Sequence, residues 1–143
     1  VTKGVITADD AAKAHVRDVV WGLGHISRGM YAPSGEPKNY SQLASIQFGV
    51  LMAEKALIWN AEEMADNGTD KGCLSLDITK WPAATKKLLG LAAGVKARAD
   101  KKGAEKLKKD YVDDAKMKAN IHAPVAERLL RFSKESFVYA VSY

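Results

Sequence analysis

The 143-residue sequence predicts a mainly α fold, a helical domain of about five helices with a small β-hairpin. Apolar residues recur at steps of three and four along most of the chain, as in helices that face a core. One central stretch instead alternates apolar and polar residues next to an Asn-Gly pair, which is typical of a hairpin. The chain has no repeat and no low-complexity linker, so residues 1–143 are expected to form a single domain.

The first helix is expected to run from Thr7 to about Met30. Thr7 and Asp10 form a capping-box-like pair at its start, in which side-chain oxygens satisfy free N–H groups of the first turn. Gly22 and Gly24 weaken the helix and favour close packing there. The apolar stripe that should face the core is Ala12, Val16, Val19, Val20, Leu23, Ile26 and Met30.

A loop and a second helix follow. The stretch from Tyr31 to Asn39 contains Pro33, Gly35 and Pro37, and this density of helix-breaking residues predicts a loop. The second helix is expected from about residue 40 to residue 56. Its buried side should comprise Leu43, Ile46, Phe48, Val50 and Leu51.

The predicted hairpin begins at Leu57 and turns around Asn67-Gly68. Its loop should extend from about residue 60 to residue 72, with room for a helical turn at residues 61–65. In the second strand the residues expected to alternate inward are Leu74, Leu76 and Ile78, against Ser75 and Asp77 outward.

Three more helices are predicted in the second half of the chain. Thr79 should cap a helix that carries Pro82 in its first turn and ends near Ala99, with Leu88, Leu91, Ala92 and Val95 as its apolar stripe. Asp100 should cap a helix from Lys101 to Tyr111. The last helix falls within residues 113–132, where Pro124 either kinks it or marks the first turn of a separate helix. The tail SFVYAVSY is expected to add a strand or to pack as extended chain.

Composition limits the possible classes of protein. No run approaches the roughly 18 apolar residues of a spanning helix, so a membrane protein is not expected. The single Cys73 excludes an intrachain disulfide, which favours a reducing, cytoplasmic location. The net charge of +5 is concentrated in a basic run of seven residues, namely Lys96, Arg98, Lys101, Lys102, Lys106, Lys108 and Lys109. Nucleic-acid binding is not expected, because no aromatic residue able to stack on bases interrupts this run.

The sequence contains no complete catalytic or metal-binding motif. The histidines are His15, His25 and His122, and none begins a His-Glu-x-x-His zinc motif. His15 and His25 lie about 15 Å apart along one helix, so they cannot share an ion. His15 and His122 are expected to be partly buried rings with one hydrogen-bond partner each. Cys73 is expected to be a small apolar residue of the second strand, and no Gly-x-Ser-x-Gly or phosphate-loop motif is present. No catalytic residue, metal ligand or bound cofactor is therefore assigned.

His25 and Arg28 are the candidate substrate-binding residues. They are three positions apart, so they project from one face of the first helix. They also lie immediately before the Pro/Gly loop, where substrate-contacting groups are often placed.

One segment resembles a known family. VKARADKKGAEKLKKDY, from Val95 to Tyr111, is similar to the I-x-A-x-G-D-x-x-A-x-x-L-x-x-x-Y stretch near the C-terminus of dipeptidyl peptidase III-like zinc peptidases. Ala99 stands where the pattern has Gly. The residues in register are Val95, Ala97, Asp100, Leu107 and Tyr111.

Other segments extend the resemblance over most of the chain. ITADDAAKAHVRDVVWGLGHISRGMY resembles the family's acidic-start helix, with Arg28 near a matching arginine. IQFGVLMAEKALIW resembles its L-Q-x-N-Y-x-x-E-K-G-A segment through Gln47, Glu54, Lys55 and Ala56. The hairpin, the Pro82 helix and HAPVAERL agree in order and spacing. The family has a histidine just before the second helix, whereas this loop offers only Ser34, Asn39 and Ser41.

The resemblance implies that this chain is the C-terminal helical part of a zinc-dependent peptidase or hydrolase. The parent protein would hold zinc through motifs N-terminal to Val1, and the N-terminal remainder would be the partner of this chain. The chain would supply a scaffold and one wall of a cleft for peptide substrates, without activity alone. The alternative is a noncatalytic helical module that binds a protein partner or an acidic polymer through the basic run. A homodimer of the fragment is also plausible, since a separated part would expose an apolar face.

Overall fold

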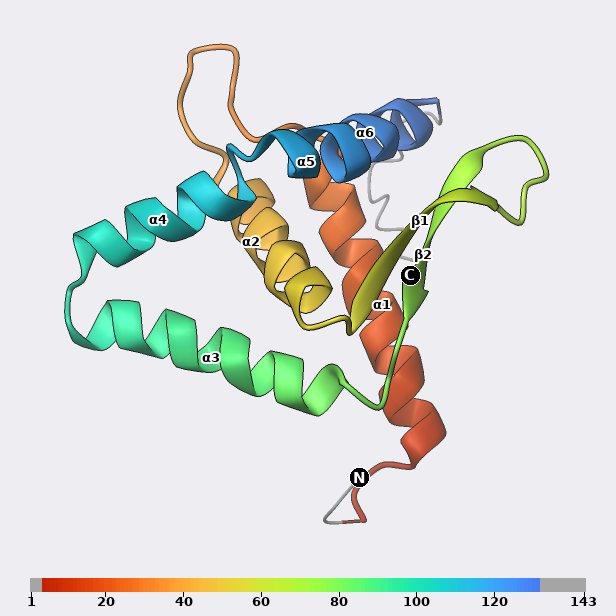
Figure 1. The fold of residues 1–143 in the computed structure, drawn as a ribbon, viewed down its shortest axis with the longest axis horizontal. Coiled ribbons are helices and arrows are strands. Elements are labelled where there is room, and N and C mark those ends of the chain that lie inside the picture. Colours follow the sequence, from red (N-terminus) through yellow and green to blue (C-terminus); the bar gives the residue numbers. More distant parts are fainter. Residues whose placement is uncertain (1–3, 132–143) are drawn as a thin grey trace, which may run out of the picture.

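Helices form most of the part of the chain that the structure describes, residues 4–131 of a computed structural model (Figure 1). The mainly helical fold with one antiparallel hairpin is thereby confirmed. The expectations for Phe132 and for the tail SFVYAVSY lie outside the described residues. The elements are α1 (Ala8–Ile26), α2 (Asn39–Ala53), β1 (Leu57–Met64), β2 (Lys71–Leu76), α3 (Trp81–Ala97), α4 (Lys101–Tyr111), α5 (Ala115–Met117), the π-helical turn η1 (Lys118–His122) and α6 (Ala123–Leu130).

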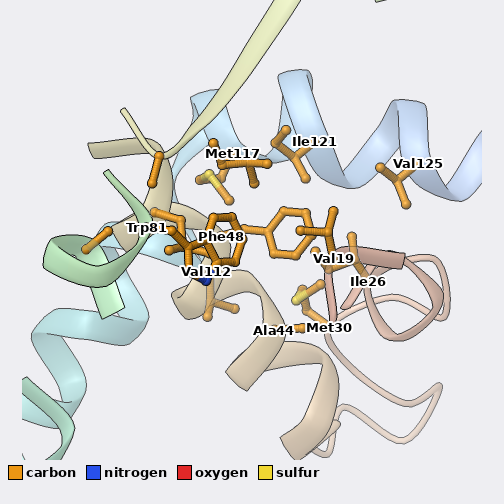
Figure 2. Packing of buried hydrophobic residues seen from close by; sticks show 14 residues of the cluster. Val19, Ile26, Met30, Ala44, Phe48, Trp81, Val112, Met117, Ile121 and Val125 are labelled. Atoms are coloured by element: carbon orange, nitrogen blue, oxygen red, sulfur yellow. The ribbon is translucent and has the colours of Figure 1, made fainter. Parts of the chain in front are cut away.

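Helix α2 is the centre of the packing. It contacts α1, α3, α4 and β1, while the segment from α5 to α6 lies across its end (Figure 1). Phe48 of α2 is only 2% exposed and lies among side chains from α1 and from the C-terminal helices (Figure 2). Those neighbours include Val19, Ile26, Met117 and Ile121, all buried. Burial of these side chains is the main force holding the elements together.

Helix α1 begins as the sequence predicts and ends earlier. Thr7 Oγ1 accepts a hydrogen bond from the Asp10 N–H at 3.1 Å, and Asp10 Oδ2 accepts one from the Thr7 N–H at 3.2 Å. The helix stops at Ile26 rather than near Met30, because Gly29 follows with φ +78°, outside the helical region. Gly22 allows close packing, since a Cβ there would lie 2.6 Å from the Phe48 ring.

The predicted apolar stripes of α1 and α2 were too wide. Val16, Val20 and Leu43 are 49%, 61% and 46% exposed. Helix α1 is covered by α2 on one side and by α6 near its middle, so only Val19 and Ile26 are fully buried among its stripe residues within the helix. An apolar residue is buried only where another element covers it, which spacing along one helix does not reveal.

Strand β1 is longer than the sequence predicts, whereas β2 begins and ends earlier than predicted. Leu57 pairs with Leu76 and Met64 with Lys71, with an irregularity in the ladder between Asn60 and Met64. The helical turn expected at residues 61–65 is therefore wrong, because residues 61–64 continue β1 through the bulged part of the ladder. The Asn67-Gly68 turn is confirmed: Gly68 has φ +70°, a conformation that favours glycine.

Helix α3 differs from the prediction at its start and along its length. Thr79 does not cap it, because its hydroxyl donates to Asp77 Oδ1 at 2.5 Å; Lys80 occupies the cap position instead. Pro82 lies in the first turn as expected. Within α3 only Trp81 and Ala84 are buried, whereas Leu91 and Ala92 of the predicted stripe are exposed. Ile78, expected to point inward, is 36% exposed beyond the end of β2.

A tight corner joins α3 to α4. Asp100 caps α4 as predicted, with Oδ1 accepting from the Gly103 N–H at 2.9 Å. Ala99, just before it, has φ +48°, in the left-handed region that non-glycine residues rarely adopt. The residue after a helix commonly adopts this conformation, and glycine is the residue that favours it.

Of the two alternatives for Pro124, the structure has the first turn of a separate helix, α6. Asp114 caps α5 by accepting from the Met117 N–H at 2.9 Å. Pro124 lies in the first turn of α6, directly after the π-helical turn η1. A proline has no N–H to donate to the carbonyl four residues earlier, so the wider turn accommodates it without a break.

Candidate functional site

His25 is part of an aromatic cluster at the C-terminal end of α1. Its ring centroid lies 4.1 Å from that of Trp21 and 5.4 Å from that of Tyr40. Trp21 and Tyr40 are 49% and 64% exposed, so both rings are accessible. Ser41 fixes the geometry, because its hydroxyl donates to the His25 carbonyl at 2.7 Å and so ties the start of α2 to the end of α1.

Arg28 is exposed and close enough to influence His25, but it lies in the turn just after α1. The prediction that it shares a helical face with His25 is wrong, because α1 ends at Ile26. Partial burial lowers the pKa of His25, and the positive charge of Arg28 lowers it further. The imidazole is therefore neutral at pH 7 and can donate or accept a hydrogen bond. The structure thus brings the two predicted site residues within electrostatic range of each other.

Sequence reasoning missed Trp21 and Tyr40 as members of this site. Trp21 lies four positions before His25 and so on the same helical face. That spacing was the available signal. Tyr40 had no such signal, because only the folding of the loop brings the start of α2 against α1.

The loop between α1 and α2 is held in place by polar contacts. The Tyr31 hydroxyl donates to Asp113 Oδ1 at 2.8 Å, and Lys108 Nζ donates to Asp113 Oδ2 at 2.6 Å. These two bonds lower the pKa of Asp113, so the carboxylate stays charged. Of the three loop residues that stand near the family's histidine, Ser34 and Asn39 are exposed, whereas Ser41 is buried and bound to His25.

A pocket of about 590 Å³ opens beside the cluster, between α1, α2 and α3. We call it the aromatic pocket; its walls include Trp21, Gln47, Phe48, Trp81, Thr85 and Leu88. Trp21 belongs both to this pocket and to the His25 cluster. The two features therefore share one side chain, that of Trp21.

His15 contributes to the same region in a way the sequence did not predict. Its ring stacks on Trp81 with centroids 4.9 Å apart and planes at 29°. The expectation of a half-buried ring is met, but the contact that the structure gives is an aromatic stack rather than a hydrogen bond. Two histidines of α1 thus support the two tryptophans of the aromatic pocket.

His122 forms a close pair with Ser45 inside the fold. Its Nε2 lies 2.7 Å from Ser45 Oγ, and that hydroxyl donates to the Tyr111 carbonyl at 2.6 Å. Because the serine proton is used in this way, Nε2–H is the donor to the oxygen. A Ser–His distance of this size also occurs in nucleophilic sites, but Ser45 is fully buried and out of reach of substrate. The pair is a buried structural contact, as expected for His122.

The described residues do not fit a zinc ion. Within residues 4–131 no three His, Cys, Asp or Glu side chains come together as metal ligands. The three histidines are engaged separately, with Trp81, with Trp21 and Tyr40, and with Ser45. No step of any reaction is therefore assigned to zinc held by this part of the chain.

Four of the seven residues in the basic run form ion pairs with nearby acidic side chains. Lys106 Nζ lies 2.5 Å from Asp110 and Lys108 Nζ 2.6 Å from Asp113. Lys101 pairs with Glu105 at 3.8 Å, and Arg98 pairs with Asp100 at 3.6 Å. These contacts offset much of the local positive charge that an acidic partner would need.

None of the helices in residues 4–131 combines the length and apolar character required to cross a bilayer.

Comparison with protein-family models, with curated proteins and with solved structures gives no match to this chain.

Proposed function

We propose that this chain is the helical substrate-cleft and scaffold part of a zinc-dependent peptidase or hydrolase resembling dipeptidyl peptidase III. In this proposal the zinc and the general base belong to the N-terminal remainder of the parent protein. The chain itself binds and positions peptide substrate and is inactive alone.

The observation that carries the proposal is the exposed cluster of His25, Trp21 and Tyr40 with Arg28 beside it. The cluster combines a neutral imidazole, two accessible aromatic rings and a cation at one end of a rigid helix pair. A peptide backbone needs hydrogen-bond partners and its terminal carboxylate needs a positive charge. His25 would bond the backbone, and Arg28 would bind a carboxylate.

The fixed geometry of the cluster also favours binding. Ser41 joins the two helices, and Lys38 Nζ donates to the Arg28 carbonyl at 2.5 Å. The groups that would contact substrate are thus held before it arrives, which reduces the entropy lost on binding. The sequence resemblance supplies the reaction class, and the geometry of the cluster supports the binding of a peptide.

The proposal is tested by titrating tetra-alanine into the ¹⁵N-labelled chain and following amide and indole signals by NMR. Signals of Trp21, His25, Arg28 and Tyr40 should shift, and Arg28→Ala should weaken binding at least tenfold. Arg98→Ala, which removes an exposed arginine at the end of α3, is the matched control and should leave binding unchanged.

Two results would overturn the proposal. Absence of shifts at millimolar peptide, or equal losses for Arg28→Ala and Arg98→Ala, would exclude peptide binding at the cluster. Robust release of dipeptides by the chain with zinc added, abolished by His25→Ala, would show that the chain contains a complete catalytic site.

A further inference from the structure

The aromatic pocket has the size and the lining of a binding site for an apolar group. Its volume of about 590 Å³ lies within the roughly 300–1,000 Å³ of pockets that bind small ligands. Rings of Trp21, Phe48 and Trp81 form its walls together with Leu88. Aromatic walls favour a flat or bulky apolar group, because stacked and edge-on ring contacts add to the burial of apolar surface.

The two tryptophans are held in position from outside the pocket. His25 packs on Trp21 at 4.1 Å, and His15 stacks on Trp81 at 4.9 Å. Phe48 is fixed by the core, where it is 2% exposed. The walls are therefore formed before a ligand enters, and little side-chain entropy is lost on binding.

Polar groups at the same pocket suit the backbone of a peptide. Gln47 carries an amide that can both donate and accept, as a peptide group requires. Arg17 and Asp18 also line the pocket and pair with each other at 3.1 Å, both well exposed. An exposed pair of this kind contributes little to stability, so it can exchange partners with a ligand at low cost.

From these observations we propose that the aromatic pocket takes one aromatic or large aliphatic side chain of a peptide whose neighbouring residues contact His25 and Arg28. Trp21 is the link, because it lines the pocket and packs on His25. The inference rests on the proposed function and adds to it a substrate class: peptides with a bulky apolar residue next to the part bound by the cluster.

The first test compares N-acetylphenylalanine amide with N-acetylglutamate amide in the ¹⁵N-labelled chain. The phenylalanine compound should shift the indole N–H signals of Trp21 and Trp81, while the glutamate compound should not. Trp59 of β1 does not line this pocket but a separate apolar one with Leu74 and Leu76, so its signal reports binding that is not specific to the aromatic pocket. Equal shifts for both compounds, or shifts of all three indoles, would overturn the proposal.

The second test uses variants of α3. Leu88→Arg places a charge in the pocket wall and should weaken binding of the phenylalanine compound at least tenfold. Leu89→Arg is the matched control, since Leu89 is 63% exposed, is not part of the wall and should not affect binding. If Leu88→Arg fails to fold, Thr85→Trp, which fills the pocket, replaces it. Unchanged binding in a folded pocket variant would refute the proposed site.

The third test separates this inference from the proposed function. Ala-Ala-Phe-Ala should bind at least tenfold more tightly than tetra-alanine. Leu88→Arg should remove this difference in affinity, whereas Arg28→Ala should weaken the binding of both peptides. If tetra-alanine binds through Arg28 but Ala-Ala-Phe-Ala binds no more tightly, the inference about the pocket is refuted and the proposed function stands. If only the phenylalanine compound binds, the proposed function fails, and with it the link between the pocket and a peptide cleft.

Discussion

Replacing Ala99 by glycine is expected to stabilise the chain, although alanine is normally the better residue near a helix. Ala99 has φ +48°, which costs an L-residue about 1–2 kcal/mol relative to glycine. The greater conformational entropy of glycine in the unfolded chain offsets about 0.5–1 kcal/mol of this gain. The expected net increase in the free energy of unfolding is about 0.5–1 kcal/mol. With a urea slope of about 2 kcal/mol/M, the midpoint should rise by about 0.3–0.5 M.

The matched control is Ala93→Gly, which lies exposed within α3 and has no left-handed conformation to relieve. It should lower the free energy of unfolding by about 1 kcal/mol, through loss of helix propensity. Both variants are compared with the parent chain by urea unfolding followed by circular dichroism. If Ala99→Gly destabilises the chain as Ala93→Gly does, the inference that the backbone is strained at Ala99, between α3 and α4, is refuted.

Two further predictions concern the buried contacts of α2. Gly49→Ala should lower the free energy of unfolding in urea by about 1–3 kcal/mol, because the new Cβ would lie 2.1 Å from the Tyr111 ring. The loss should be smaller when Tyr111 is also replaced by alanine, and an equal loss would contradict the clash. Burial lowers the pKa of His122 below its usual 6.5, so the unfolded chain takes up a proton at a pH where the folded chain does not. Stability should therefore be complete above pH 6.5 and fall as the pH drops towards the folded pKa. His122→Gln, which can still donate to Ser45, should reduce this dependence in unfolding experiments at pH 5 and 7, and an unchanged dependence would exclude His122 as a source.

The α3–α4 corner accounts physically for two neighbouring residues of the segment from Val95 to Tyr111. Asp100 matches the pattern, and it caps α4. Ala99 departs from the pattern, and it occupies the left-handed position where glycine is favoured. Both positions are thus explained by the requirements of a helix–helix corner, which bear on fold rather than on chemistry.

The sequence by itself determined those features that depend on a few neighbouring residues. The capping pair of Thr7 and Asp10, the Asn67-Gly68 turn and the Asp100 cap are local hydrogen-bonding and conformational preferences, and the structure has each of them. The same holds for the choice of helix or hairpin along the chain. His25 and Arg28 could be identified as neighbours because they lie only three positions apart in the sequence, although Arg28 lies in the turn after α1 and not on the helix itself.

Only the tertiary structure decided which apolar residues are covered and which side chains from different elements meet. Val20 and Leu43 follow helical spacing yet are exposed, because burial depends on a second element that the spacing does not specify. Tyr40 joins His25, and Trp81 joins Trp21 at one pocket, through contacts between helices separated along the chain. The candidate site is formed by such long-range contacts, so its chemistry becomes visible only once α1, α2 and α3 are packed together.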